Sequence, residues 1–125
     1  MIELKVLDTI AADCNGRARE KGFWDKERNV GETMALITSE LSEALSAHQK
    51  GRFANLEAFE KDIESGRDFI EAFREHIKDS YEDEYADAFI RLFDAVGGYG
   101  IPISKYIEYK MEFNLSRERH NGKRY

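Results

Sequence analysis

Apolar side chains in this chain recur at intervals of three and four residues, a spacing that gathers them on one side of an α-helix. The period of two that indicates β-strands is largely missing. The chain contains a single proline, Pro102, so almost no position interrupts a helix. We therefore expect an all-α fold, a helical bundle without strands.

The spacing predicts helices over most of the 125 residues. The expected ranges are 2–20, 32–50, 81–96 and about 103–119, with two shorter helices within 52–80 that are broken at Gly66. Glycines mark the helix ends, with Gly97, Gly98 and Gly100 expected to end the helix over 81–96, and Pro102 opens the last helix. No internal repeat or low-complexity tract is present, so we expect a single domain, 1–125.

Charge and composition limit the classes of protein to which this chain can belong. Hydrophobic residues make up 42% of the chain and charged residues 35%, which is typical of a globular domain rather than a disordered chain. The net charge of −6 argues against a protein that binds DNA or RNA polymers, because such proteins neutralise phosphates with excess cations.

The sequence also favours a reducing compartment away from membranes. Cys14 is the only cysteine, so no intramolecular disulfide can form, and the three histidines have unrelated spacings. The opening residues carry Glu3, Lys5 and Asp8 where a signal peptide needs an apolar stretch, and no window approaches the ~18 apolar residues of a membrane span. We expect a cytoplasmic protein with no membrane partner.

Two pairs of carboxylates have the same spacing. Glu40 and Glu43 lie three residues apart in ELSE, as do Glu84 and Asp87 in EYAD, so each pair shares one helical face next to the apolar stripe. If the two helices are neighbours, ionised carboxylates at about 6 Å repel by about 2.8 kcal/mol at an effective dielectric constant of about 20. Divalent cations such as Mg²⁺ or Mn²⁺ relieve this repulsion, so the pattern predicts a metal site.

These acids have two other interpretations. The simpler one is that they are ordinary solvated charges on helix faces, which is how most glutamates on helices behave. The other is a di-iron bundle, which needs a glutamate three residues before each ligating histidine. The residues three before the histidines are Leu45, Phe73 and Arg117, which largely excludes this site.

Two further features suit a nucleotide ligand. Lys110, Asn114 and Arg117 share one face of the last helix and could bind phosphate oxygens, although a basic helix end is also favoured by the helix dipole. Trp24 lies in a polar loop before the first carboxylate pair, where it could stack on a nucleobase. A lone tryptophan more commonly fills a core, and that alternative stays open.

With ELSE, EYAD and the closing KMEFNLSRERHNGKRY in view, the chain resembles the MazG-like nucleotide pyrophosphohydrolases of the all-α NTP pyrophosphatase superfamily from Phe23 onward. The resemblance implies metal ligands at Glu40, Glu43, Glu84 and Asp87. It implies substrate-binding residues at Lys110, Asn114, Arg117, Lys123 and Tyr125, with Gly122 in the same closing pattern. The acidic motifs are farther apart here than in compact members, so 52–80 is read as a helical insertion, and Asn121 stands where the family usually has histidine.

The resemblance implies Mg²⁺-dependent hydrolysis of a nucleoside triphosphate to the monophosphate and pyrophosphate, with Mn²⁺ as a substitute metal. Glu40 and Glu43 are the implied catalytic residues, and Glu43 is favoured for helping to deprotonate the attacking water. Family members complete their bundle with helices of neighbouring subunits, which implies a homodimer or homotetramer. The alternative function is a non-catalytic helical oligomerisation module whose acids are only solvated.

Overall fold

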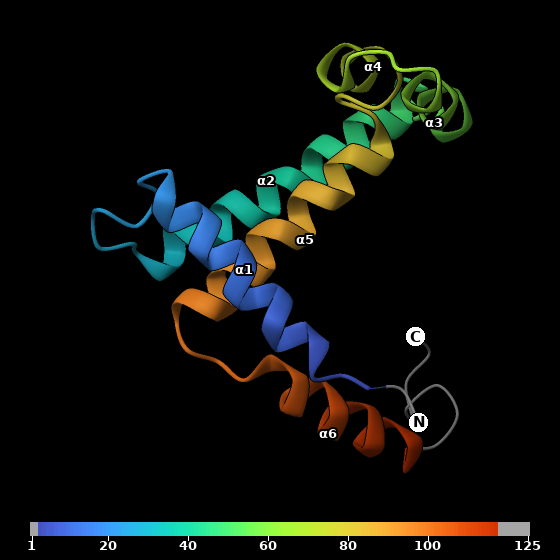
Figure 1. Cartoon of the computed structure of the whole chain (residues 1–125). Coiled ribbons are helices and arrows are strands. Elements are labelled where there is room, and N and C mark those ends of the chain that lie inside the picture. Colours follow the sequence, from blue (N-terminus) through green and yellow to red (C-terminus); the bar gives the residue numbers. More distant parts are fainter. Residues whose placement is uncertain (1–2, 118–125) are drawn as a thin grey trace. The chain divides into compact units, whose positions relative to one another are not determined.

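Six α-helices account for the regular structure of the computed structural model, which describes residues 3–117, and this range contains no strand. The helices are α1 (Val6–Glu20), α2 (Val30–Gln49), α3 (Leu56–Glu64), α4 (Phe69–His76), α5 (Tyr81–Gly98) and α6 (Ile103–Leu115) (Figure 1). The prediction of an all-α chain is thus confirmed for this range. None of these helices is both long and apolar enough to cross a membrane.

The chain divides into two compact units. Unit 2 is the continuous stretch 27–92, with α2, α3, α4 and the first two thirds of α5, and unit 1 contains the described residues before and after it. Unit 1 therefore holds α1, the last residues of α5 and α6. The sequence predicted a single domain, and that stays a prediction.

Polar side chains define where the helices of unit 2 begin. At each start a side-chain oxygen accepts a hydrogen bond from a backbone N–H of the first turn, which satisfies a donor that has no partner within the helix. The donor and acceptor pairs are Glu32 to Asn29, Ala58 to Asn55, Glu71 to Asp68 and Asp83 to Ser80. The helix α2 ends where Gly51 turns to a φ of 69°, a conformation that glycine adopts without strain.

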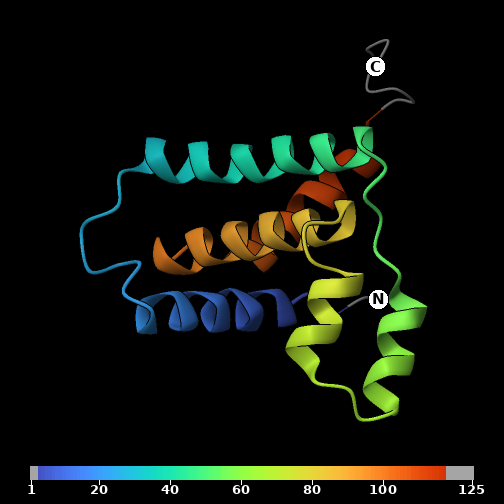
Figure 2. The ribbon, with the colours of Figure 1, turned by 90° about the horizontal axis from the view of Figure 1, so that it is seen from above.

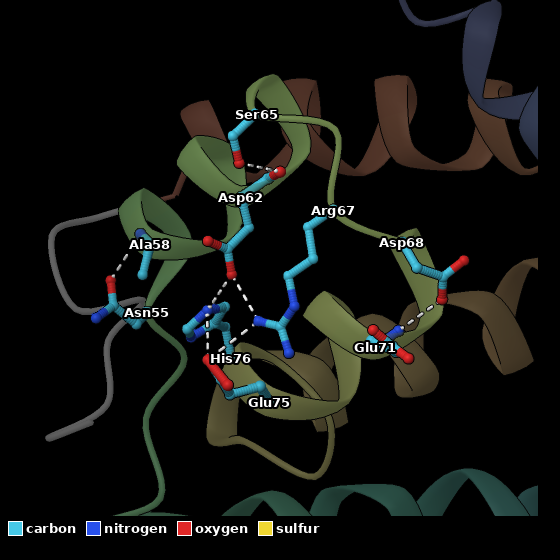
Figure 3. Close-up of polar contacts among 9 residues, drawn as sticks. All are labelled: Asn55, Ala58, Asp62, Ser65, Arg67, Asp68, Glu71, Glu75 and His76. Atoms are coloured by element: carbon cyan, nitrogen blue, oxygen red, sulfur yellow. Dashed lines mark hydrogen bonds and ion pairs between the residues drawn. The ribbon is translucent and has the colours of Figure 1, made fainter.

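The segment predicted as a helical insertion forms a hairpin of α3 and α4, side by side in Figure 2. The two helices are joined by an ion-pair network centred on Arg67, whose Nη1 lies 2.7 Å from Asp62 and 3.2 Å from Glu75 (Figure 3). His76 Nε2 lies 2.8 Å from the same oxygen of Asp62. The hydrogen bonds from Arg67 and His76 hold the pKa of Asp62 below its usual value. Because Arg67 already supplies the positive charge, this acid and histidine cluster is explained as a structural network.

In unit 1, α1 contacts both α6 and the end of α5. Asp8 accepts a hydrogen bond from the backbone N–H of Ser104 at 3.0 Å and another from its hydroxyl, so a residue of α1 caps the first turn of α6. These bonds lower the pKa of Asp8.

The helix was expected over about 81–96 with Gly97, Gly98 and Gly100 at its end, and α5 ends at Gly98. A Cβ at Gly97 would lie 2.5 Å from the backbone oxygen of Ala11, and one at Gly98 would lie 2.3 Å from the Trp24 ring. These glycines at the end of the helix therefore also allow close packing. The helix ends before Gly100, where φ is 69°.

The buried apolar side chains are small. Among the described residues they are seven alanines and Ile37, and none of the large apolar side chains is fully buried. On α2, Leu41 and Leu45 are 49% and 59% exposed, although both belong to the apolar stripe of the sequence. Small side chains at the contacts let helices approach closely, and they leave larger apolar side chains on the surface.

Candidate metal centre

The helices α2 and α5 run side by side in opposite directions within unit 2 (Figures 1 and 2). The connection between them returns to the end of α2, where the backbone N–H of Tyr81 donates to the carbonyl of Arg52 at 2.8 Å. This arrangement brings the carboxylate pair of α2 and the pair of α5 to the same level along the two helices.

Three of the four predicted metal ligands converge. Glu40, Glu84 and Asp87 each offer one carboxylate oxygen, and these oxygens lie within 4.8 Å of one another. The fourth predicted ligand, Glu43, belongs to the same group, because its carboxyl lies close enough to that of Glu84 to raise the pKa of Glu84. The two pairs therefore lie together, and their role as metal ligands stays a prediction.

Glu84 is the most constrained member of this group. Glu84 is only 6% exposed, and its Oε2 is buried without a hydrogen-bond partner among the described residues. Burial raises the pKa of Glu84 to about 7, and the carboxyl of Glu43 acts in the same direction, followed by the charges of Asp87 and Glu40. A buried carboxylate oxygen with no donor is costly in water-free surroundings, and a cation would satisfy it.

Burial and negative charge also act on the acids next to Glu84. Burial raises the pKa of Asp87, and the negative charges of Asp83 and Glu40 raise it further. One cation of the protein reduces the charge of the group: Arg91 Nε lies 2.6 Å from Oε1 of Glu40. The donor set is therefore all oxygen, negatively charged and only partly neutralised, which suits a hard divalent cation such as Mg²⁺ or Mn²⁺.

A second group of acids shares Glu84. Asp79, Asp83 and Glu84 also bring one oxygen each to within 4.8 Å. Two of these acids have structural contacts of their own, since Asp83 Oδ2 accepts a hydrogen bond from the backbone N–H of Asp79 at 2.9 Å, and Lys78 lies 3.4 Å from Asp79. These contacts explain the position of the pair without a metal.

The predicted phosphate-binding residues lie in the other unit. Lys110 Nζ and the guanidinium of Arg117 lie 5.1 and 5.5 Å from the centre of the Phe113 ring, so the two cations share one face of the end of α6. Asn114 is exposed next to them. Lys123 and Tyr125 lie outside the described residues. The role of these residues in binding phosphate stays a prediction.

Trp24 has extensive contacts within unit 1. Its Nε1 donates to Oδ1 of Asp94 at 2.8 Å, its ring meets that of Tyr99 edge to face, and the guanidinium of Arg19 lies 4.9 Å from its ring centre. Asp94 is 7% exposed, so this hydrogen bond is largely shielded from water. These contacts support the packing role, and base stacking by Trp24 stays a prediction.

Sequence reasoning missed two arginines at the carboxylates. Arg91 follows Asp87 by four residues and Glu84 by seven, so helical spacing alone places it on the same face of α5. Arg52 lines a pocket together with Glu43 and Glu84, but it lies in the connection after α2, where no helical spacing relates it to the acids.

Comparisons with protein-family models, with curated proteins and with solved structures gave no match to this chain.

Proposed function

We propose that the protein is a Mg²⁺-dependent nucleoside triphosphate pyrophosphohydrolase of the MazG-like type. It would convert an NTP or dNTP to the monophosphate and pyrophosphate, and so sanitise or control a nucleotide pool. The observation that carries this proposal is the buried Glu84 oxygen without a donor, set among Glu40, Glu43 and Asp87. The same four acids form the motifs by which the sequence resembles this family.

The residues present fit a divalent cation, and Glu40, Glu43, Glu84 and Asp87 would hold it. When bound, such a cation would neutralise phosphate charge and lower the pKa of the attacking water. The carboxylate of Glu43 accepts a proton from that water, in agreement with its role in the motif. The water oxygen attacks the α-phosphorus, the bond from this phosphorus to the bridging oxygen breaks, and pyrophosphate leaves.

Cations of the chain would hold the substrate. Lys110, Arg117 and Lys123 bind phosphate oxygens, and Asn114 positions the nucleotide together with Tyr125. In a chain of net charge −6, a triphosphate needs such local cations in addition to the metal. The cytoplasmic nucleotide pool is the proposed source of substrate, and the single cysteine Cys14 suits that reducing compartment.

We also propose that the chain assembles into a homodimer or homotetramer. Support comes from the apolar surface of unit 2, where Leu41 and Leu45 of α2 and Tyr85 of α5 line one groove and are 49%, 59% and 41% exposed. Phe89, one turn farther along α5, is 58% exposed. Apolar surface of this kind is typical of helices that pack against a partner.

The same surface favours the second candidate function, a non-catalytic oligomerisation module. The two functions differ in what they require of the acids. A module needs its apolar surface and tolerates neutral amides at positions 40, 43, 84 and 87, whereas the hydrolase loses its ligands.

The test is an assay of the purified protein with a panel of NTPs and dNTPs plus Mg²⁺, in which pyrophosphate and phosphate are measured separately. Pyrophosphate release that a chelator abolishes supports the hydrolase. Glu43→Gln should then reduce turnover by orders of magnitude with unchanged helicity, while Glu60→Gln, an equal charge change on exposed α3, should have no effect. No turnover of any nucleotide favours the module, and release of phosphate alone indicates a different hydrolase.

A further inference from the structure

One pocket of unit 2 lies where α2 ends and α5 begins, beside the carboxylate group. It is lined by Glu43, Ser46, Ala47, Arg52, Asp79 and Glu84. Two of the predicted metal ligands thus share a pocket with an arginine that no motif of the sequence singled out. The lining contains no aromatic residue on which a nucleobase could stack.

The backbone of Arg52 is held at both ends. Its N–H donates to the carbonyl of Ala47 at 2.9 Å, in the last turns of α2, and its carbonyl accepts from Tyr81 at the start of α5 at 2.8 Å. Gly51, with a φ of 69°, makes the turn that allows both bonds. The side chain of Arg52 therefore starts from a fixed point between the two helices that carry the acids.

Arg52 differs from the other arginines described near acids in this chain. Arg91 pairs with Glu40, Arg67 with Asp62, and Arg17 with Asp13. Within residues 3–117 the side chain of Arg52 has no carboxylate partner, although three acids line the same pocket. Its donors are thus available to a ligand.

The pocket is therefore lined by two groups of opposite sign without a protein partner. Glu84 has a buried Oε2 that lacks a donor, and the exposed side chain of Arg52 has no acidic partner within residues 3–117. A single ligand that satisfies both must bring a cation to the carboxylate and anionic oxygens to the guanidinium. A phosphate chain with a bound divalent cation has this composition, and the planar guanidinium matches a pair of phosphate oxygens.

We propose that Arg52 binds the β- and γ-phosphates of the metal-bound triphosphate, and hence the pyrophosphate product, in this pocket. The proposal rests on the proposed function and adds a substrate-binding residue within unit 2. The cavity volume of about 260 Å³ is small and its lining polar, which suits a phosphate chain better than a nucleoside.

The experiment measures binding of inorganic pyrophosphate by calorimetry in the presence of Mg²⁺, for the wild type, Arg52→Gln, Arg52→Lys and Arg74→Gln. Arg74 on α4 is the matched control, since it is exposed and has the same charge. We expect Arg52→Gln to weaken pyrophosphate binding by about 10- to 100-fold, the range for loss of a charge-assisted contact, and Arg52→Lys to weaken it less. Mn²⁺ binding without an anion and helicity should be unchanged.

Each other outcome overturns the proposal: a wild type that binds no pyrophosphate, an Arg52→Gln variant that binds within about twofold of the wild type, or an equal loss in Arg74→Gln. Binding is measured without turnover, so the two proposals can fail separately. If no nucleotide is hydrolysed yet Arg52→Gln loses pyrophosphate, the anion site stands and the hydrolase proposal fails. If nucleotides are hydrolysed with an unchanged KM in Arg52→Gln and pyrophosphate binding is retained, only the role of Arg52 fails.

Discussion

Arg91 of α5 and Glu40 of α2 form an ion pair, with 2.6 Å between Arg91 Nε and Glu40 Oε1. The Glu40 side chain is 9% exposed and that of Arg91 is 40% exposed, so the carboxylate is the more shielded partner. One acid of the candidate metal centre thus has a cation from the protein itself. In the absence of metal, this arginine offsets part of the repulsion in the group.

We expect Arg91→Gln to lower the free energy of unfolding in a chelator by about 1–3 kcal/mol, less than for a fully buried pair because Arg91 is partly solvated. At saturating Mg²⁺ the loss should be smaller, since the metal then neutralises Glu40. Urea unfolding with and without Mg²⁺ measures both values. Lys61→Gln, which removes an exposed pair with Glu57, should change the stability little in either buffer. An equal loss with and without Mg²⁺ for Arg91→Gln would place Glu40 outside any metal site.

The second prediction concerns pH and Glu84. Its pKa is raised from 4.5 to about 7 in the folded protein, so between these values the folded state keeps a proton that the unfolded chain has lost. The stability of the metal-free protein should therefore fall as pH rises through this window. The raised pKa of Asp87 acts with the same sign, from its ordinary value of 3.8 upward. The lowered pKa values of Asp8 and Asp62 add stability above 3.8 that is lost below it, outside this window.

Melting temperatures of the wild type and Glu84→Gln between about pH 4.5 and 7.5, in a chelator, test this prediction. The difference between the two proteins isolates Glu84 from every other ionisable group, since both proteins share those groups. Glu84→Gln should melt at a higher temperature than the wild type at the alkaline end, and Mg²⁺ should reduce that gap. Parallel pH profiles for the two proteins would contradict the assigned pKa.

The helices could be predicted from the sequence because the apolar period and the glycine and proline positions are local signals. The same signals did not show which apolar side chains are buried. Leu41 and Leu45 continue the apolar stripe of Ile37 and Ala44 on α2. Both leucines are exposed, whereas Ile37 and Ala44 are buried. Burial depends on which surfaces meet, and spacing within one helix does not contain that information.

The sequence showed that each carboxylate pair shares one helical face, but whether the two faces meet at the same level depends on how the helices pack. The two arginines beside these carboxylates differ in how far the sequence could indicate them. Arg91 had a local signal, its spacing from Asp87, whereas Arg52 reaches the pocket only through the turn after α2. Gly97 and Gly98 lie at the end of α5 as expected, but the sequence did not show that they also allow a close approach, because a glycine in a sequence does not distinguish the two roles.

The third prediction tests that close approach. A Cβ at Gly97 would lie 2.5 Å from the backbone oxygen of Ala11, which cannot rotate away. Gly97→Ala should therefore lower the free energy of unfolding by about 1–3 kcal/mol, the usual cost of overpacking. Gly16→Ala is the control, because nothing lies within 4 Å of a Cβ there, and it should raise the stability by about 0.5–1 kcal/mol through its higher helix propensity. Equal effects of the two substitutions would mean that α1 and α5 are not in contact at Gly97.

The last prediction separates packing from base recognition at Trp24. Phenylalanine keeps an aromatic face for stacking but cannot donate to Asp94, which accepts from Trp24 Nε1 at 2.8 Å and from Asn15 at 3.0 Å. If the tryptophan is a packing residue, Trp24→Phe should lower the free energy of unfolding by about 1–3 kcal/mol and leave the KM for every nucleotide unchanged.

Arg117→Ala provides the opposite pattern for comparison. Arg117 follows the end of α6 by two residues and contacts the exposed ring of Phe113, so its removal should raise KM by about 10- to 100-fold with little change in melting temperature. A normal melting temperature combined with a raised KM in Trp24→Ala, and an unchanged KM in Trp24→Phe, would show that the ring serves the nucleotide. An early melting Arg117→Ala with normal KM would make that arginine a structural residue, since its charge would then act on Phe113 alone.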